Sequence, residues 1–130
     1  MPLINFDIYD NLTKEQVKIL ADSVHKAVLE AFGVPERDRY QVIRRHAADE
    51  MILLDTGLGF ERDEHKAIVI QVVSSPRTVE AKQEFYRLVA KYVEENLNID
   101  SKNILISIVE NTKADWSFGY GEAQFLTGKL

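Results

Sequence analysis

The second residue of the chain is a proline, and its place at the start of the fold makes it the first candidate for chemistry. Removal of Met1 would turn Pro2 into a free secondary amine, which can act as an acid, a base or a nucleophile. A simpler interpretation is that a small residue behind Met1 only permits removal of the methionine. Pro2 therefore becomes a catalytic candidate if residues that suit the same chemistry lie near it.

Arg77 is the second candidate, because it follows Ser75 and Pro76 and stands at the start of a helix that Thr78 is expected to cap. A guanidinium beside the N–H groups of a helix start forms an anion site that suits a substrate carboxylate. Such a cation would also lower the pKa of a nearby amine, whereas a carboxylate such as Asp38 would raise it. The alternatives are a solvated arginine and a surface aspartate that pairs with a neighbouring charge.

The C-terminal segment 115–130 is too rich in aromatic residues for a solvated tail. Its residues Trp116, Phe118 and Phe125 would suit the wall of an apolar pocket, but also a core or a subunit interface. We expect this segment, as a β-hairpin or a tail, to pack against the body of the protein or against a neighbouring subunit.

Composition excludes several kinds of chemistry. The chain has no cysteine, so a disulfide, a thiolate nucleophile and a cysteine-bound metal are all excluded. The net charge is −5, and the 16 basic residues are scattered among 21 acidic ones, so nucleic acid is not an expected partner. Apolar runs such as 67–73 are too short to span a membrane, so we expect a cytoplasmic protein without a membrane partner.

Neither a metal nor a cofactor is expected. His25, His46 and His65 are too far apart in the sequence to resemble a metal-ligand motif, and we expect them at the surface or at caps. The turn 57–59 contains two glycines but lacks the third glycine of a dinucleotide fingerprint.

Hydrophobic periodicity predicts the elements that must position the candidate residues. Thr13 and Gln16 form a capping-box pattern at the start of a first helix, which Gly33 and Pro35 should end. A second helix should start after Thr78. Alternating or continuous apolar runs predict four principal strands, near residues 4–8, 40–43, 67–73 and 104–109.

The chain also resembles itself at an offset of 65 residues, most clearly within the two helices, where Leu20 matches Phe85 and Val24 matches Val89. We therefore expect one α+β domain over residues 1–130, built from pseudo-repeats at about 2–46 and 66–110. Each repeat would be a β-α-β unit, and together they would form a four-stranded mixed sheet with both helices on one face. The other sheet face would be apolar and bare, which predicts a homo-oligomer that covers it.

The local sequence strings give a more specific resemblance. The chain resembles the tautomerase superfamily, and within it the malonate semialdehyde decarboxylase branch. The resemblance rests on Pro2, on the doubled β-α-β pattern and on five strings, at residues 32–35, 38–41, 55–59, 115–119 and 125–128. It covers essentially the whole chain.

The resemblance implies a small, cofactor-independent enzyme, a trimer or hexamer and most simply a homotrimer, that acts on a small oxo acid through its amino-terminal proline. It implies Pro2, Asp38 and Arg77 as catalytic residues, with an aromatic pocket wall. The residues that would contact the substrate are Ser75, Trp116, Phe118 and Phe125.

One difference from that branch concerns the substrate clamp. Ser75 stands where the decarboxylases have the first of two arginines, and this should leave Pro2 more readily protonated. A further hypothesis is that Arg44 or Arg45 replaces the missing cation, and alternation along a strand allows only one of them to face the site. Decarboxylation is the leading hypothesis. The alternatives are keto–enol tautomerisation of an arylpyruvate-like acid, hydration of an unsaturated acid, and a non-catalytic binding protein of the same fold.

Overall fold

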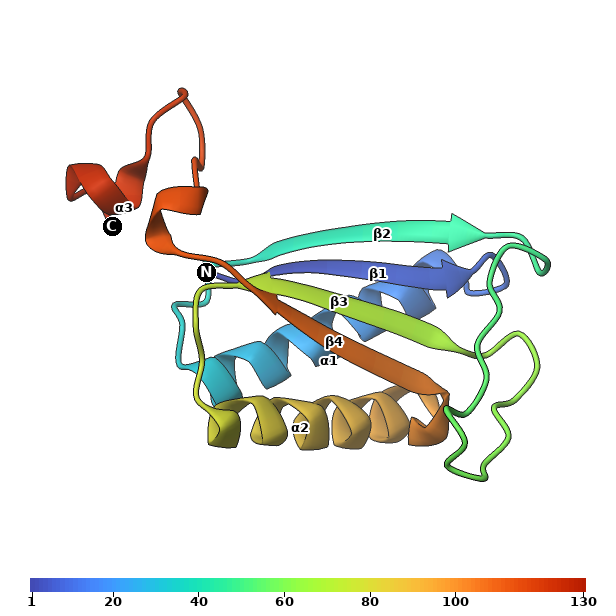
Figure 1. The fold of residues 1–130 in the computed structure, drawn as a ribbon. Coiled ribbons are helices and arrows are strands. Elements are labelled where there is room, and N and C mark those ends of the chain that lie inside the picture. The colour runs from blue at the N-terminus through green and yellow to red at the C-terminus, as the bar shows by residue number, and fades with distance from the viewer.

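The structure is a computed structural model that describes all 130 residues (Figure 1). Its main elements are two long helices and four strands, as the periodicity predicts. In chain order they are β1 (Leu3–Tyr9), α1 (Lys14–Phe32), β2 (Tyr40–His46), β3 (Ile68–Ser74), α2 (Val79–Leu97) and β4 (Ile104–Glu110). Two 3₁₀ turns, η1 (Ser101–Asn103) and η2 (Lys113–Asp115), and a short helix α3 (Gln124–Thr127) complete the chain.

The four strands form one mixed sheet in the order β2-β1-β3-β4. Strand β1 is parallel to β2 and antiparallel to β3, and β3 is parallel to β4. Both long helices lie on the same face of the sheet (Figure 1). The predicted α+β fold, a doubled β-α-β unit with helices on one face, is confirmed.

The ends of the two helices show why the same local structure forms twice. The hydroxyl of Thr13 accepts from the backbone N–H of Gln16, whose side chain accepts from Thr13 in return, so the predicted capping box is present. Thr78 caps α2 in the same way through its hydroxyl. Gly33 and Asn98 end the two helices in the left-handed conformation, with φ of 64° and 54°.

Between the two halves, β1 and β3 start 65 residues apart, and so do α1 and α2. The N-caps and the C-caps keep the same separation. The second strands differ by one position, because η1 precedes β4. The two halves therefore place equivalent residues in equivalent positions on either side of the β1–β3 pair.

A single core lies between the sheet and the two helices. Alternate residues of β1 and β3 point into it, and each is almost fully buried: Ile4, Phe6, Ile8, Ile68, Ile70 and Val72. The helices contribute a matching set, which includes Leu20, Val24, Val28, Phe85, Val89 and Val93. Burial of each such side chain contributes roughly 1.5–3 kcal/mol, which is enough to hold the two strand starts firmly in register.

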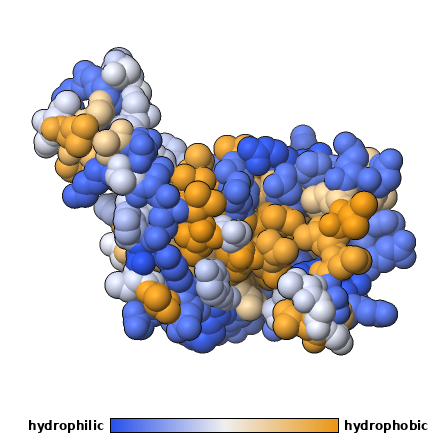
Figure 2. Space-filling view, viewed as in Figure 1, coloured by the Kyte–Doolittle hydropathy of each residue, from blue (hydrophilic) through white to orange (hydrophobic).

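The opposite sheet face is bare in one subunit, but it is less apolar than the sequence predicts. Tyr40, Val42 and Val109 are 41–47% exposed on it, and Figure 2 shows apolar side chains gathered over the middle of the sheet. Polar residues of the central strands, such as Asp7 and Gln71, interrupt this surface. The face thus combines apolar patches with a polar row.

The segment after β4 contains no strand, so of the two predicted forms the structure has the tail and not the β-hairpin. The tail extends beyond the end of the sheet, away from the two long helices (Figure 1). Its side chain Tyr120 is 99% exposed, and Leu126 is 64% exposed. None of the helices is both long enough and apolar enough to cross a membrane.

Candidate active site

The start of the chain lies at one end of the sheet, because Leu3 pairs with Tyr40 of β2 on one side and with Val73 of β3 on the other. Pro2 is buried there. Met1 is present, and burial lowers the pKa of its α-amine, with a smaller lowering by the Arg77 charge and an opposing effect of Asp38. An amine at this position is therefore held between a cation and a carboxylate.

Asp38 lies in the turn before β2, where its backbone N–H donates to the Pro35 carbonyl at 2.9 Å. The residue is only 6% exposed, and neither carboxylate oxygen accepts a hydrogen bond. Burial raises the pKa of Asp38, while the chain-start amine and Arg77 lower it. Asp38 is therefore not the ion-paired surface aspartate that was the alternative interpretation.

His25 was expected at the surface or at a cap, and that prediction is wrong. The side chain comes from α1, is 6% exposed, and its Nε2 lies 2.9 Å from the carbonyl oxygen of Glu36. Its positive form would lower the pKa of Asp38. His25 thus ties the loop that carries Asp38 to the first helix, a role that depends on a tertiary contact.

Arg77 is half-buried and held by several contacts. Its Nε donates to the Ser74 hydroxyl at 3.1 Å, and its backbone N–H donates to the Glu110 carboxylate at 2.8 Å. The guanidinium carbon lies 5.0 Å from the centre of the Phe32 ring, and Nη1 lies 3.5 Å from the Phe32 carbonyl oxygen. These contacts orient the guanidinium, so the solvated alternative does not describe it.

The structure offers no replacement for the missing arginine from β2. Arg44 and Arg45 pair with Asp7 and Ile8 at the far end of β1, five and six residues beyond Pro2. A strand rises about 3.3 Å per residue, so both side chains lie too far from the chain start of their own subunit. The hypothesis that one of them faces the site within one subunit is therefore wrong.

Ser75 follows β3 and is half-buried, and its backbone carbonyl accepts from the Ser74 hydroxyl at 2.8 Å. Its own hydroxyl makes no hydrogen bond. Ser75 thus places a short side chain where a long cation was expected from the resemblance.

The aromatic residues of the tail form one stack that reaches the sheet. The rings of Trp116 and Phe118 are stacked with centroids 5.4 Å apart, and the edge-to-face pair of Phe118 and Phe125 is 5.5 Å apart. Phe118 also meets Tyr40 of β2 at 5.6 Å. The Trp116 indole N–H donates to the Asn111 side chain at 2.8 Å. Phe118 is therefore the centre of the aromatic cluster.

Two cavities meet at Tyr40 and Phe118. The first has a volume of about 400 Å³ and contains the chain start; its lining is Met1, Pro35, Arg37, Asp38, Tyr40, Phe118, Gln124, Lys129 and Leu130. The second, of about 410 Å³, includes Trp116 and Asn111. Phe125 lines neither cavity and packs against Phe118 from the side.

The structure thus brings Asp38 and Phe118 to the chain start, with Arg77 close enough to influence both ionisable groups electrostatically. Trp116 lies in the adjoining cavity, and Ser75 lines neither. Sequence reasoning missed two cations of the first cavity, Arg37 and Lys129. Arg37 could have been proposed from the sequence, because it lies in the same charged loop as Asp38. No sequence pattern points to Lys129.

Comparison with known proteins identifies the family of the chain. Two family models, each described as tautomerase enzyme, match residues 38–119 and 2–61. The probable tautomerase YrdN of Bacillus subtilis (strain 168) is 50% identical over 130 residues, which is the full length of both chains. The chain therefore belongs to the tautomerase superfamily.

Solved structures refine the assignment. A malonate semialdehyde decarboxylase, with reported decarboxylase and hydratase activities and a mutant in which its first residue, a proline, is alanine, superposes with a TM-score of 0.95. That protein is 44% identical, and 98% of each chain is covered. A fused 4-OT, crystallised as a symmetric trimer, shares the fold at 22% identity and a TM-score of 0.78, with 97% of this chain and 98% of the other covered. The chain lies in the malonate semialdehyde decarboxylase-like branch, as the sequence strings predicted.

Proposed function

We propose that the chain is a cofactor-independent, cytoplasmic enzyme that decarboxylates malonate semialdehyde or a closely similar 3-oxo acid through the amine of Pro2. Removal of Met1 exposes this amine. Asp38 and Arg77 are its catalytic partners, and the aromatic tail forms the wall of the site.

The observation that carries the proposal is the buried Asp38 carboxylate, whose two oxygens accept no hydrogen bond beside the chain start. A buried charge without a partner is costly, so its retention is expected where it serves a function. An ammonium at Pro2 would supply the missing donor. The likeness to a malonate semialdehyde decarboxylase supports the same assignment.

In the proposed reaction, Arg77 binds the substrate carboxylate and Pro2 acts on the aldehyde carbonyl. Breaking the bond between the α-carbon and the carboxylate releases carbon dioxide and leaves its electron pair on an enolate. In one route the protonated Pro2 stabilises this charge by hydrogen bonding to the carbonyl oxygen. In the other, the neutral amine first condenses with the aldehyde to an iminium and releases water; loss of carbon dioxide then gives an enamine, and protonation at carbon and hydrolysis return the free amine. Protonation at carbon gives acetaldehyde, and the overall reaction consumes one proton.

Opposing effects set the protonation of the Pro2 amine. At the chain start, burial and the Arg77 charge lower the pKa of the amine and Asp38 raises it. Ser75 removes one of the two cations expected from the resemblance, and this change by itself favours the acid form. The Phe118 ring lines the same cavity as Asp38 and the chain start, and an apolar wall strengthens charge interactions by lowering the local dielectric.

A second candidate is hydration of an unsaturated acid or keto–enol tautomerisation of an arylpyruvate-like acid. Ser75 favours it, since one arginine fewer changes how the carboxylate is held, and the similar decarboxylase also carries a hydratase activity. A pocket of about 400 Å³ has room for an arylpyruvate.

We also propose that the enzyme is a homotrimer. The bare sheet face carries exposed Tyr40, Val42 and Val109, and the exposed Tyr120 and Leu126 of the tail give a second surface for a neighbouring subunit. The symmetric trimer of the fused 4-OT supports this assembly. Sedimentation at several concentrations should give three times the subunit mass of 14.9 kDa.

The reaction is identified by proton NMR of three substrates in parallel: malonate semialdehyde, an unsaturated 3-carbon acid and phenylpyruvate. The proposal expects the fastest turnover for malonate semialdehyde, with acetaldehyde as product. If hydration or tautomerisation is faster than decarboxylation, the second candidate becomes the assigned function. No turnover of any of the three would favour a binding protein of this fold.

A further inference from the structure

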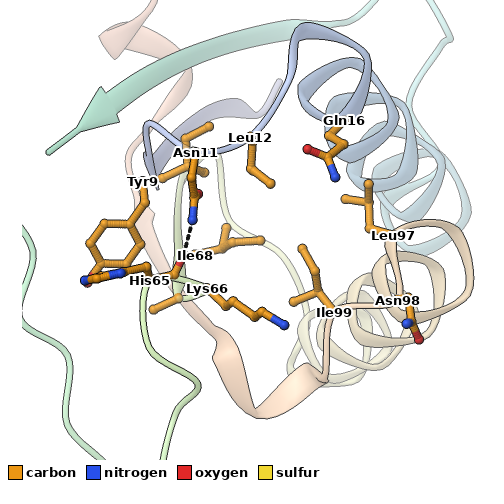
Figure 3. A pocket seen from close by; sticks show the side chains of 12 residues that line it. Tyr9, Asn11, Leu12, Gln16, His65, Lys66, Ile68, Leu97, Asn98 and Ile99 are labelled. Carbon is orange, nitrogen blue, oxygen red and sulfur yellow. Dashed lines mark hydrogen bonds between the residues drawn. The ribbon is translucent and has the colours of Figure 1, made fainter. Parts of the chain in front are cut away.

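The internal duplication implies a second site, because Ala67 stands one residue before β3 as Pro2 stands one residue before β1. A cavity of about 330 Å³ lies beside Ala67, at the end of the sheet opposite to the chain start. Figure 3 shows it enclosed by the end of β1, the start of α1 and the end of α2. Its lining is Ile8, Tyr9, Asn11, Leu12, Gln16, His65, Lys66, Ala67, Ile68, Leu97, Asn98 and Ile99.

Several residues of this cavity have equivalents near Pro2, 65 residues away in the sequence. The end of α2 at Leu97 and Asn98 corresponds to the end of α1 at Phe32 and Gly33. The cavity beside Ala67 therefore lies at the position in the second half that corresponds to the chain start, although the equivalents of Pro35, Asp38 and Tyr40 do not line it.

Two substitutions change the chemistry of the counterpart. Leu12 takes the place of Arg77, and Asn103 takes the place of Asp38. Asn103 is fully buried and engaged on both sides: its Oδ1 accepts from the Asp63 backbone at 2.7 Å, and its Nδ2 donates to the Asp63 carboxylate at 3.0 Å. The nitrogen of Ala67 belongs to a peptide bond. The cavity thus lacks both the amine and the carboxylate of the Pro2 site.

The cavity still contains a cation. The Lys66 side chain runs along it, with its ammonium facing the Ile99 side (Figure 3), and it forms no ion pair. No aspartate or glutamate lines the cavity. Across from Lys66, Gln16 uses its amide oxygen in the helix cap, so its amide N–H groups are free to donate.

We propose that this cavity is a second, non-catalytic binding site for a small monocarboxylate with a short apolar chain. The carboxylate accepts from the Lys66 ammonium and the Gln16 amide, and the carbon chain lies against Ile68, Leu97 and Ile99. The site goes beyond the proposed reaction, because it requires neither Pro2 nor the removal of Met1.

The test is an amide NMR titration with sodium propionate, with sodium chloride at equal ionic strength as the reference. It uses the Arg77→Ala variant, so that the Pro2 site is weakened and its signals are separable. We expect saturable shifts at Leu12, Lys66, Ala67 and Ile99. Lys66→Met should weaken this binding about tenfold or more, since a hydrogen bond to a charged group is the stronger kind, whereas Lys113→Met, at an exposed lysine without an ion pair, should not.

A gain-of-binding variant tests the correspondence itself. Leu12→Arg places a cation where Arg77 stands in the other half, and propionate should bind about tenfold more tightly. The proposal is overturned if shifts appear only around the chain start, if chloride reproduces them, or if Lys66→Met binds as the parent does. None of these results bears on the proposed decarboxylation, which is measured separately in protein with an intact Arg77.

Discussion

Replacing Asp38 with asparagine should lower the pKa of the Pro2 amine in the processed chain. The carboxylate stabilises the ammonium form, and asparagine keeps the shape of the side chain while removing its charge. A close opposite charge changes a pKa by about 1–3, and Asp38 is only 6% exposed, so solvent screens the interaction little. We therefore expect the pKa of the Pro2 amine to fall.

Arg77→Leu should act in the opposite direction. The guanidinium lowers the pKa of the chain-start amine, so its removal should raise that pKa. The Arg77 charge acts on the chain-start amine more strongly than the Asp38 charge, so this rise should be at least as large as the fall caused by Asp38→Asn. The two variants together separate the effects of the two charges on the pKa of the Pro2 amine from the effect of burial.

The assay is a pH titration of the Pro2 nitrogen by NMR in protein labelled with ¹⁵N-proline. Asp49→Asn serves as the matched control, since Asp49 is exposed and its side chain makes no hydrogen bond. If Pro2 acts as an acid, decarboxylation is lost as pH rises through the amine pKa, so Asp38→Asn should move this limb to lower pH by the same amount. An unchanged or raised pKa in Asp38→Asn would refute the reasoning.

Three further predictions concern the structure around the site. Phe118→Ala should reduce kcat/KM at least about tenfold, because the contact with the Tyr40 ring is lost. It should change the Tm by less than about 3 °C, because the tail lies outside the core. A large fall in Tm would show that the tail stabilises the fold. Gly33→Ala should lower the free energy of unfolding by about 1–2 kcal/mol, because Gly33 has φ of 64°. Asn98→Gly, at the equivalent cap of α2, should change that free energy by less than about 0.5 kcal/mol. Equal effects of the two variants in urea denaturation would argue against backbone strain at Gly33. Phe6→Ala should cost about 3–5 kcal/mol by the same measurement, since the side chain is fully buried, and a loss below about 1 kcal/mol would contradict the core as described.

The regular elements were predictable from the sequence because their signals are local. Capping residues such as Thr13 and Thr78 and the helix stop at Gly33 depend only on near neighbours, and the structure places them as predicted. The doubled β-α-β fold followed from the same periodicity. Asp38 and Phe118 were named through the resemblance, and both line the cavity at the chain start.

The remaining features depend on contacts between distant residues. His25 is buried on α1, and its side chain lies within hydrogen-bond distance of the Glu36 carbonyl, a contact that no periodic pattern encodes. Arg44 and Arg45 were misplaced because strand alternation gives the face of a residue and not its distance along the strand. The tail lacks a partner strand, so its aromatic residues pack as side chains on Tyr40 and on one another.

The most direct test of the central claim measures decarboxylation of malonate semialdehyde by proton NMR with wild-type and Pro2→Ala proteins. Mass spectrometry must first establish that Met1 is absent from both, so that each chain begins with a free amine. If the secondary amine of Pro2 carries the reaction, kcat/KM in Pro2→Ala should fall about 10²-fold or more, while Asp49→Asn retains wild-type activity. Wild-type activity in Pro2→Ala would contradict the account.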